Sequence, residues 1–535
     1  MADKVLIIQE ARLGDLIQSG ALVQRICDEG NTPTLLVREG VVEGAKALKV
    51  APEILSWPDF GNPAIPHSFY ERVAGSREFI RKVRQLGFSR AIVLNHHGTG
   101  IALAKILGIP VSGFDHLFDR GDGSSVPLSG WPAYLVASSR GVRALNRIHL
   151  SDMWRGFAGP GVIPPRPASS VEEGERRGPT VVVLGGRSPF RRLAPPALVR
   201  LVSALVKIDG SPVILSGGPE DRELGESIAR EAGSGVTNTA GQTGVGELSA
   251  LIAEAGVVLS PDTATLHLAA SRGIPTVGLF FASALPFETG AYREGALSVV
   301  TREDCYPCAG EGSSCTSLSC RNEPDPDVLA RIVAGRRRGE PAFQIATRLS
   351  GFLTGSHLFV ARETPSGLLQ EAATPVAPSK EALLAVLLRR FVVRYLNPEV
   401  PLLSLSQEIF LSGMRLAKHG SEKELPFVGG TEGAGIDPRW FVRLERGVEL
   451  YLGLRERSLH PGERERMVDR LAADFPALWP LLHHLERVEG GQGDLPGLLR
   501  AGAALSWETM SAGRLLGREQ GREIPQKEEI HVAVR

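Results

Sequence analysis

The 535-residue sequence predicts an α/β protein with two Rossmann-like domains followed by a mostly helical C-terminal extension. Three observations lead to this prediction. Short apolar runs alternate with helical stretches twice along the chain, a Pro-, Gly- and charge-rich stretch separates the two series, and a helical pattern replaces them after Arg338. Short continuous apolar runs between helices are typical of strands buried on both faces of a parallel sheet.

The first series predicts an N-terminal domain at residues 1–165. Its expected strands are 5–8, 34–37 and 91–94, and its expected helices are 15–28 and 71–86. The stretch 160–179 is too rich in Pro, Gly and charge to support a periodic element, so we place the interdomain linker there.

The second series predicts a domain of similar kind at residues 178–335. Its expected strands are 180–184, 212–216, 257–260 and 276–280, and its expected helices are 195–208, 221–232, 245–254 and 265–272. Two such domains facing a cleft occur in glycosyltransferases, but also in periplasmic-type binding proteins and some dehydrogenases. The fold alone therefore does not define the function.

The extension, residues 340–535, shows helical spacing in several segments joined by Gly-rich stretches. These segments are 380–396, 404–418, 439–452, 462–475 and 477–488. Their apolar faces and Arg-rich edges suit either packing on the other domains or docking to a partner or an anionic membrane surface.

Composition narrows the classes of function. Hydrophobic residues make up 43% and charged residues 22% of the chain, as in folded soluble proteins. A formal net charge of zero argues against nucleic acid as a partner. The start of the chain reads as a first strand instead of a signal peptide, and no apolar run reaches membrane-spanning length. We expect a cytoplasmic protein, with peripheral membrane contact.

Arg12, Gly14 and Asp15 follow the first expected strand and open the first helix. Ligands of open α/β sheets bind beyond the carboxyl ends of the strands, where this turn lies. Glycine allows a ligand to approach the backbone, and a carboxylate beside it can accept a proton from an incoming hydroxyl. Asp15 could equally serve only to complement the helix dipole.

Two loops of the second domain carry groups suited to a nucleotide. Arg191 and Arg192 lie in a Gly-rich loop after the strand 180–184, where guanidinium groups suit phosphate oxygens, although a solvated basic loop is equally consistent. Glu220 follows the strand 212–216 and could bind ribose hydroxyls, or belong to an ordinary turn before a helix capped by Asp221.

A third loop follows the strand 257–260 and contains Asp262, Thr263 and Ala264, with His267 in the first turn of the next helix. Free N–H groups at a helix N-terminus suit a diphosphate. A lone histidine on a helix is commonly structural, so the spacing only modestly favours a ligand site.

Four of the five cysteines, Cys305, Cys308, Cys315 and Cys320, lie close together in the sequence. Their number and spacing are compatible with a structural zinc site. Disulfides, a redox-sensitive loop and unpaired thiols remain alternatives.

Together these segments resemble glycosyltransferase family 9, over about residues 4–335. The matching motifs are Leu13-Gly-Asp15, Arg191-Arg-Leu-Ala-Pro195, Gly217-Gly-Pro-Glu220, Asp262-Thr263 with His267-Leu-Ala-Ala270, and Cys305-Tyr-Pro-Cys308. The resemblance implies the GT-B fold and an inverting transfer, without a metal or other cofactor, from an ADP-heptose or related ADP-sugar to a lipid-linked or lipopolysaccharide core-type acceptor.

The resemblance also implies roles for individual residues. Asp15 becomes the general base, with Arg12 and Gly14 on the acceptor side, and Arg191 takes the place of a lysine that neutralises the leaving diphosphate. Glu220 meets the ribose, and the remaining donor-binding positions are Arg192, Asp262, Thr263, Ala264 and His267. The chain departs from the family at Arg191, at Ala264 in place of Gly, and at Ser19-Gly20 in place of Thr-Pro, which bears on the donor sugar.

Two other functions fit parts of this pattern. A non-catalytic nucleotide-sugar-binding or scaffold protein of cell-envelope glycan assembly would keep the same pocket. An oxidoreductase that uses a dinucleotide is disfavoured, because the first turn lacks Gly-x-Gly-x-x-Gly.

Overall fold

The computed structural model describes residues 2–58, 69–96, 98–116, 128, 130–140, 143–159, 177–186, 188–303, 305–308, 315, 317–353, 355–374, 376, 380–397 and 399–412. The chain forms two compact units. The first consists of Met1–Val136, Arg147–Thr374 and Glu399–Pro401, and the second of Ala137–Asn146, Pro375–Pro398 and Leu402–Arg535.

The N-terminal domain is built on a parallel sheet in the order β3-β2-β1-β4-β5. Its strands are β1 (Lys4–Ile8), β2 (Thr32–Arg38), β3 (Glu53–Trp57), β4 (Arg90–Val93) and β5 (Val111–Gly113). Val5 pairs with Pro33 on one side and with Arg90 on the other. Residues 5–8 are completely buried, which explains the uninterrupted apolar run of β1. The strand order is that of a Rossmann fold, and it reverses at β1.

The helices of this domain follow the strands, as expected for βαβ connections. They are α1 (Leu13–Asp28), α2 (Glu39–Leu48), α3 (Phe69–Gln85), α4 (Gly98–Leu107), α5 (Gly130–Arg140) and α6 (Leu150–Gly156). The strands and helices predicted for this domain are confirmed to within three residues at each end. The short β3 and β5 and the helices α2, α4, α5 and α6 were not predicted.

The second domain has a sheet in the order β13-β12-β11-β10-β9-β6-β7-β8. Its parallel strands are β6 (Thr180–Val183), β7 (Val213–Ser216), β8 (Val236–Asn238), β9 (Val257–Pro261), β10 (Thr276–Phe280) and β11 (Leu297–Thr301). These six strands again follow the Rossmann order, and the order reverses at β6. The predicted pair of Rossmann-like domains, the GT-B fold, is therefore confirmed.

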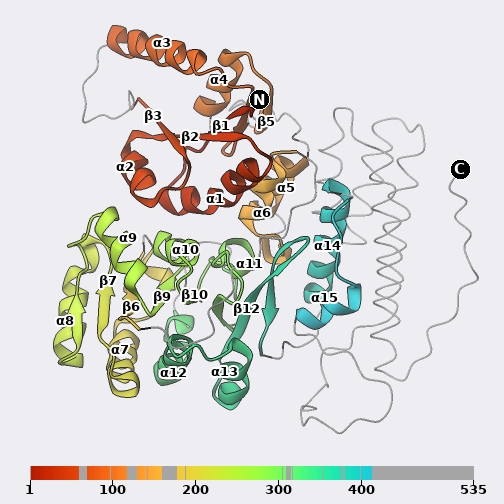
Figure 1. The fold of residues 1–535 in the computed structure, drawn as a ribbon. Coiled ribbons are helices and arrows are strands. Elements are labelled where there is room, and N and C mark those ends of the chain that lie inside the picture. Colours follow the sequence, from red (N-terminus) through yellow and green to blue (C-terminus); the bar gives the residue numbers. More distant parts are fainter. Residues whose placement is uncertain are drawn as a thin grey trace, which may run out of the picture. The chain divides into compact units, whose positions relative to one another are not determined.

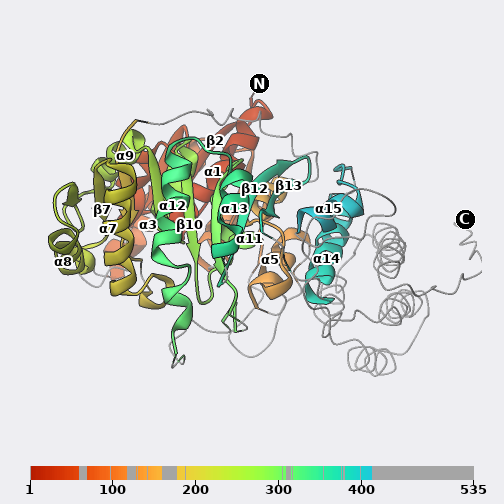
Figure 2. The ribbon, with the colours of Figure 1, turned by 90° about the horizontal axis from the view of Figure 1, so that it is seen from below.

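Helices cover both faces of this second sheet (Figure 1). They are α7 (Pro195–Asp209), α8 (Arg222–Ala232), α9 (Val245–Glu254), α10 (Ala264–Ser271), α11 (Pro286–Thr289), α12 (Pro326–Arg337) and α13 (Ala342–Leu349). Helices α7, α12 and α13 lie side by side on one face (Figure 2). A smaller apolar cluster on the other face joins Ile17 of α1 to Ile252 of α9 and Leu268 of α10, so the two domains share a core.

An antiparallel hairpin, β12 (Ser356–Thr364) and β13 (Gly367–Ala372), extends this sheet beyond β11. The predicted extension began at residue 340 and was helical, so the structure differs from the prediction here. Leu358 and Val360 of β12 are buried in the same core as α12. The missed signal is the Pro-Ser-Gly turn between two apolar runs, in which Gly367 has a φ of 105°.

Truncation tests whether the hairpin belongs to the second domain. A chain ending at Leu353, which keeps α13, should form soluble aggregates, because β11 would present an unpaired edge and the core would lose Leu358 and Val360. A chain ending at Thr374, which keeps the hairpin, is the matched control. Size-exclusion chromatography and thermal unfolding compare the two, and equal stability of both chains would contradict this assignment.

The second unit contains helices α14 (Lys380–Leu396) and α15 (Leu405–Leu411). Helix α14 confirms the predicted helix 380–396, and α15 begins one residue after the predicted start at Ser404. Buried Glu408 of α15 lies 3.1 Å from both Arg389 and Arg390 of α14. The predicted helices 439–452, 462–475 and 477–488 lie outside the described residues. Among the helices that are described, none is both long and apolar enough to cross a membrane.

Candidate functional site

Two helix N-termini meet at the carboxyl ends of the two sheets. Helix α1 begins after β1, and α10 begins after β9, beside the strand β6 where the order of the second sheet reverses. A Cβ atom at Gly14 would lie 3.5 Å from Cα of Ala264 and 3.6 Å from Cδ2 of His267. These are ordinary van der Waals distances, so the N-terminus of α1 lies directly against that of α10 at Gly14.

Asp15 occupies the first turn of α1, and its Oδ2 accepts a hydrogen bond of 3.3 Å from the backbone N–H of Arg12. It therefore does cap the helix, as the simpler interpretation expected. Burial nevertheless raises the pKa of Asp15, and the nearby Asp262 raises it further, against the opposing effects of Arg12 and His267. A carboxyl group with a raised pKa is a stronger proton acceptor once it is ionised. The side chain of Arg12 is exposed at the start of the helix.

Asp262 is the centre of a polar group before α10. Its Oδ1 lies 3.6 Å from Nε2 of His267, and its Oδ2 accepts a hydrogen bond of 3.1 Å from the Thr289 hydroxyl. The side chain of His267 is only 5% exposed, and its Nδ1 has no hydrogen-bond partner among the described residues. Thr289, in α11, was not predicted, because only the fold brings it to Asp262.

Arg191 also lies next to Asp262. Its Nη2 donates a hydrogen bond of 2.7 Å to the Ser283 hydroxyl, and its Nη1 is 3.9 Å from Oδ2 of Asp262. Thr263 precedes α10, and its hydroxyl lies 2.9 Å from that of Ser260. The structure thus brings Asp15, Arg191, Thr263, Ala264 and His267 around Asp262.

Arg192 and Glu220 have other surroundings than the residues around Asp262. Nη1 of Arg192 donates a hydrogen bond of 2.6 Å to Oδ1 of Asp221, whose side chain is 1% exposed. Glu220 is exposed, in a short turn beside Gly218. The donor-binding roles of Arg192 and Glu220 stay predictions, and Arg192 has a second, structural role.

Asp221 is a residue that the sequence suggested only as a helix cap. Its Oδ2 also accepts a hydrogen bond of 3.1 Å from the N–H of Gly218. A Cβ atom at Gly185 or at Gly217 would lie 2.4 Å or 2.7 Å from its carboxyl oxygens. Asp221 therefore holds together the loops that follow β6 and β7.

The four clustered cysteines are free thiols, and Cys305 is exposed. Sγ of Cys315 accepts a hydrogen bond of 3.4 Å from the N–H of Leu318. Within the described ranges, no group of three or more His, Cys, Asp or Glu side chains is arranged to hold a metal ion. Structural zinc at these four thiols stays a prediction.

Comparison with known proteins matches part of the second Rossmann-like domain to a family model. Residues 200–318, from α7 past the end of β11, match the sequence model of glycosyltransferase family 9 (heptosyltransferase). This segment contains Glu220, Asp262 and His267. The chain therefore carries a family 9 segment in its second Rossmann-like domain, as the resemblance of its motifs predicted.

Individual relatives also match only parts of the chain. The chain is similar to the lipopolysaccharide core heptosyltransferase OpsX of Haemophilus influenzae, with 39% identity over 83 residues, which is 15% of this chain and 24% of the relative. A glucokinase of Klebsiella pneumoniae is 31% identical over 127 residues, 24% of this chain and 37% of that protein. The chain thus spans a quarter to somewhat over a third of these relatives.

Among solved structures, the chain is similar to the ADP-heptose lipopolysaccharide heptosyltransferase II of E. coli. The TM-score is 0.44 and the sequence identity 17%, over 65% of this chain and 99% of the other.

Proposed function

We propose that the protein is an inverting, metal-independent glycosyltransferase that transfers a heptose or a related sugar from an ADP-sugar to a lipopolysaccharide core-type acceptor. The observation that carries this proposal is the approach of α1 to α10 at Gly14. It puts a half-buried carboxyl group, Asp15, beside a helix N-terminus that carries Asp262 and His267.

On the donor side, the N-terminus of α10 supplies free N–H groups for a diphosphate. The Arg191 guanidinium adds a positive charge close to this terminus, since its Nη1 lies 3.9 Å from Asp262. Both features would stabilise the negative charge that develops on the leaving diphosphate. His267 and Thr263 would bind sugar or phosphate oxygens, and Glu220 the ribose.

On the acceptor side, Asp15 would act as the general base. Its carboxylate takes the proton of the acceptor hydroxyl as that oxygen bonds to the anomeric carbon. The bond between this carbon and the phosphate oxygen breaks, and ADP leaves from the opposite face. The configuration at the anomeric carbon is therefore inverted.

The proposed acceptor also bears on location. A lipid-linked or lipopolysaccharide core acceptor would bring the enzyme to the cytoplasmic face of the inner membrane as a peripheral protein.

A thermal-shift screen of ADP-, GDP- and UDP-sugars tests the donor. Selective binding stabilises the folded state, by about 2.7 kcal/mol at a ligand concentration one hundred times the Kd. We expect ADP-sugars to give the largest shift. A preference for GDP- or UDP-sugars would contradict the heptose donor, and tight ADP-sugar binding without transfer to any acceptor would instead favour a non-catalytic binding protein.

A further inference from the structure

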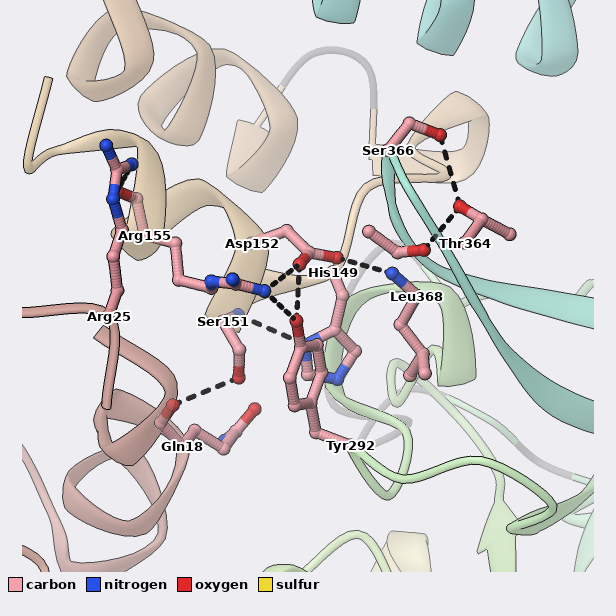
Figure 3. A network of polar contacts seen from close by, with 11 residues as sticks. Gln18, Arg25, His149, Ser151, Asp152, Arg155, Tyr292, Thr364, Ser366 and Leu368 are labelled. Atoms are coloured by element: carbon pink, nitrogen blue, oxygen red, sulfur yellow. Dashed lines mark hydrogen bonds and ion pairs between the residues drawn. The ribbon is translucent and has the colours of Figure 1, made fainter. Parts of the chain in front are cut away.

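A buried polar network joins α6, the last described helix of the N-terminal domain, to the second domain (Figure 3). Its centre is Asp152, whose side chain is 4% exposed. Oδ1 of Asp152 accepts a hydrogen bond of 2.5 Å from the Tyr292 hydroxyl, and Oδ2 accepts one of 2.9 Å from the N–H of Leu368. Arg155 lies 4.0 Å from the same carboxylate and donates to the Tyr292 hydroxyl at 3.3 Å. The buried negative charge is therefore well satisfied.

His149, immediately before α6, makes a second link to the same segment. Its Nδ1 accepts a hydrogen bond of 3.1 Å from the N–H of Ser151, so Nε2 carries the proton and donates it to the carbonyl oxygen of Gly290, 2.8 Å away. Burial lowers the pKa of His149 to about 3. The ring is thus neutral at physiological pH, and its two hydrogen bonds fix its orientation.

On its other side, α6 is bound to α1. The Ser151 hydroxyl donates a hydrogen bond of 3.0 Å to the carbonyl oxygen of Gln18, and Nη1 of Arg25 donates one of 2.6 Å to the carbonyl oxygen of Arg155. Helix α1 carries Asp15 in its first turn. Helix α6 therefore directly contacts the helix that carries Asp15, and a shift of α6 is passed to α1 through these contacts.

The segment from Thr289 to Tyr292 closes the connection. Thr289 holds the Asp262 carboxylate through its hydroxyl, while Gly290 and Tyr292 bind His149 and Asp152. The segment 289–292 thus contacts the Asp262 carboxylate at its first residue. At its other end it contacts α6, the helix that packs on α1, which carries Asp15.

We propose that Tyr292 and Asp152 are positioning residues, which act through α6 and α1 to set the Asp15 carboxyl against Asp262 and His267. The expected effect on catalysis rests on the proposed function. It also gives the β12–β13 hairpin a role, because Leu368 supplies one of the hydrogen bonds that orient Asp152. Displacement at an anomeric carbon needs the base in line with the leaving group, so small shifts of α1 are costly.

The test is Tyr292→Phe in the full chain, which removes the hydroxyl and keeps the ring that packs on His149. We expect kcat to fall about tenfold, as small misplacements of a base do, with KM for the ADP-sugar unchanged within about twofold. The acid limb of the pH profile should move to lower pH, because a looser contact with α10 leaves Asp15 better solvated. Asp152→Asn, which keeps the size of the side chain, should give the same split between kcat and KM.

Ser227→Ala is the control, because it removes a hydroxyl whose hydrogen bond to Glu231 lies within α8 of the second domain. It should leave kcat and the acid limb unchanged. Wild-type kcat and pH profiles in both Tyr292→Phe and Asp152→Asn would overturn the proposal, as would equal effects of Ser227→Ala and Tyr292→Phe.

The positioning role can also be measured apart from catalysis. Titration of the Asp15 carboxyl carbon by NMR, in protein labelled at aspartate, should show a lower pKa in Tyr292→Phe than in the wild type. An unchanged pKa would overturn the proposal. Absence of sugar transfer by the wild-type protein would instead count against the proposed function, so the two failures are distinguishable.

Discussion

Asp15→Asn should lower the rate of sugar transfer about a thousandfold while ADP-sugar binding changes by less than about twofold. Asparagine keeps the size of the side chain, and its amide oxygen can still accept the hydrogen bond from the N–H of Arg12. It cannot take a proton from the acceptor hydroxyl. Single-turnover assays of ADP release, with calorimetry of ADP binding, measure the two quantities separately, and transfer near the wild-type rate would remove Asp15 from the mechanism.

The same substitution should stabilise the folded protein above the folded-state pKa of Asp15. Because burial raises this pKa, the folded state binds the proton more tightly than the unfolded state, and ionisation of Asp15 costs stability. Wild-type stability should therefore approach that of Asp15→Asn as the pH falls through the folded-state pKa. Thermal unfolding between pH 4 and 8 checks this, and a wild type that is more stable than the variant at pH 8 would contradict it.

Asp221→Ala should destabilise the protein by about 3 kcal/mol, since it removes one partner of a largely buried ion pair. Arg192 would lose its carboxylate and Gly218 its hydrogen-bond acceptor, so the loops after β6 and β7 would separate. We expect weaker ADP-sugar binding as a consequence, measured by calorimetry below the unfolding temperature.

The neighbouring Glu220→Ala provides a matched control for stability. Glu220 is exposed, so its loss should change the free energy of unfolding by less than about 0.5 kcal/mol. Denaturant unfolding of both variants makes the comparison. Equal effects of the two substitutions would show that the ion pair between Arg192 and Asp221 does not stabilise the loops.

Much of the fold could be predicted from local patterns. Strand β1 was predictable because residues 5–8 are buried on both faces and so form an uninterrupted apolar run. The hairpin β12–β13 was not, because β12 mixes buried Leu358 and Val360 with polar residues and follows two helices. Its strand character depends on pairing with β11, which is a tertiary contact.

The candidate site, like the fold, was predictable only in part. The proximity of Asp15, Asp262 and His267 could be predicted from the sequence, because ligand-binding residues of α/β sheets gather at the carboxyl ends of strands. The pairing of Arg192 with Asp221 and the contact of Tyr292 with Asp152 join residues 29 and 140 positions apart. No local spacing predicts such pairs, since only the packing of complete elements brings them together.

A crystal structure of the protein with bound ADP would show where the diphosphate binds. We expect the diphosphate at the N-terminus of α10, against Thr263 and the Arg191 guanidinium, with the terminal phosphate facing Asp15. A nucleotide bound elsewhere, or bound with its phosphates away from α10, would contradict the proposed donor site and the roles assigned to Asp15, Asp262 and His267.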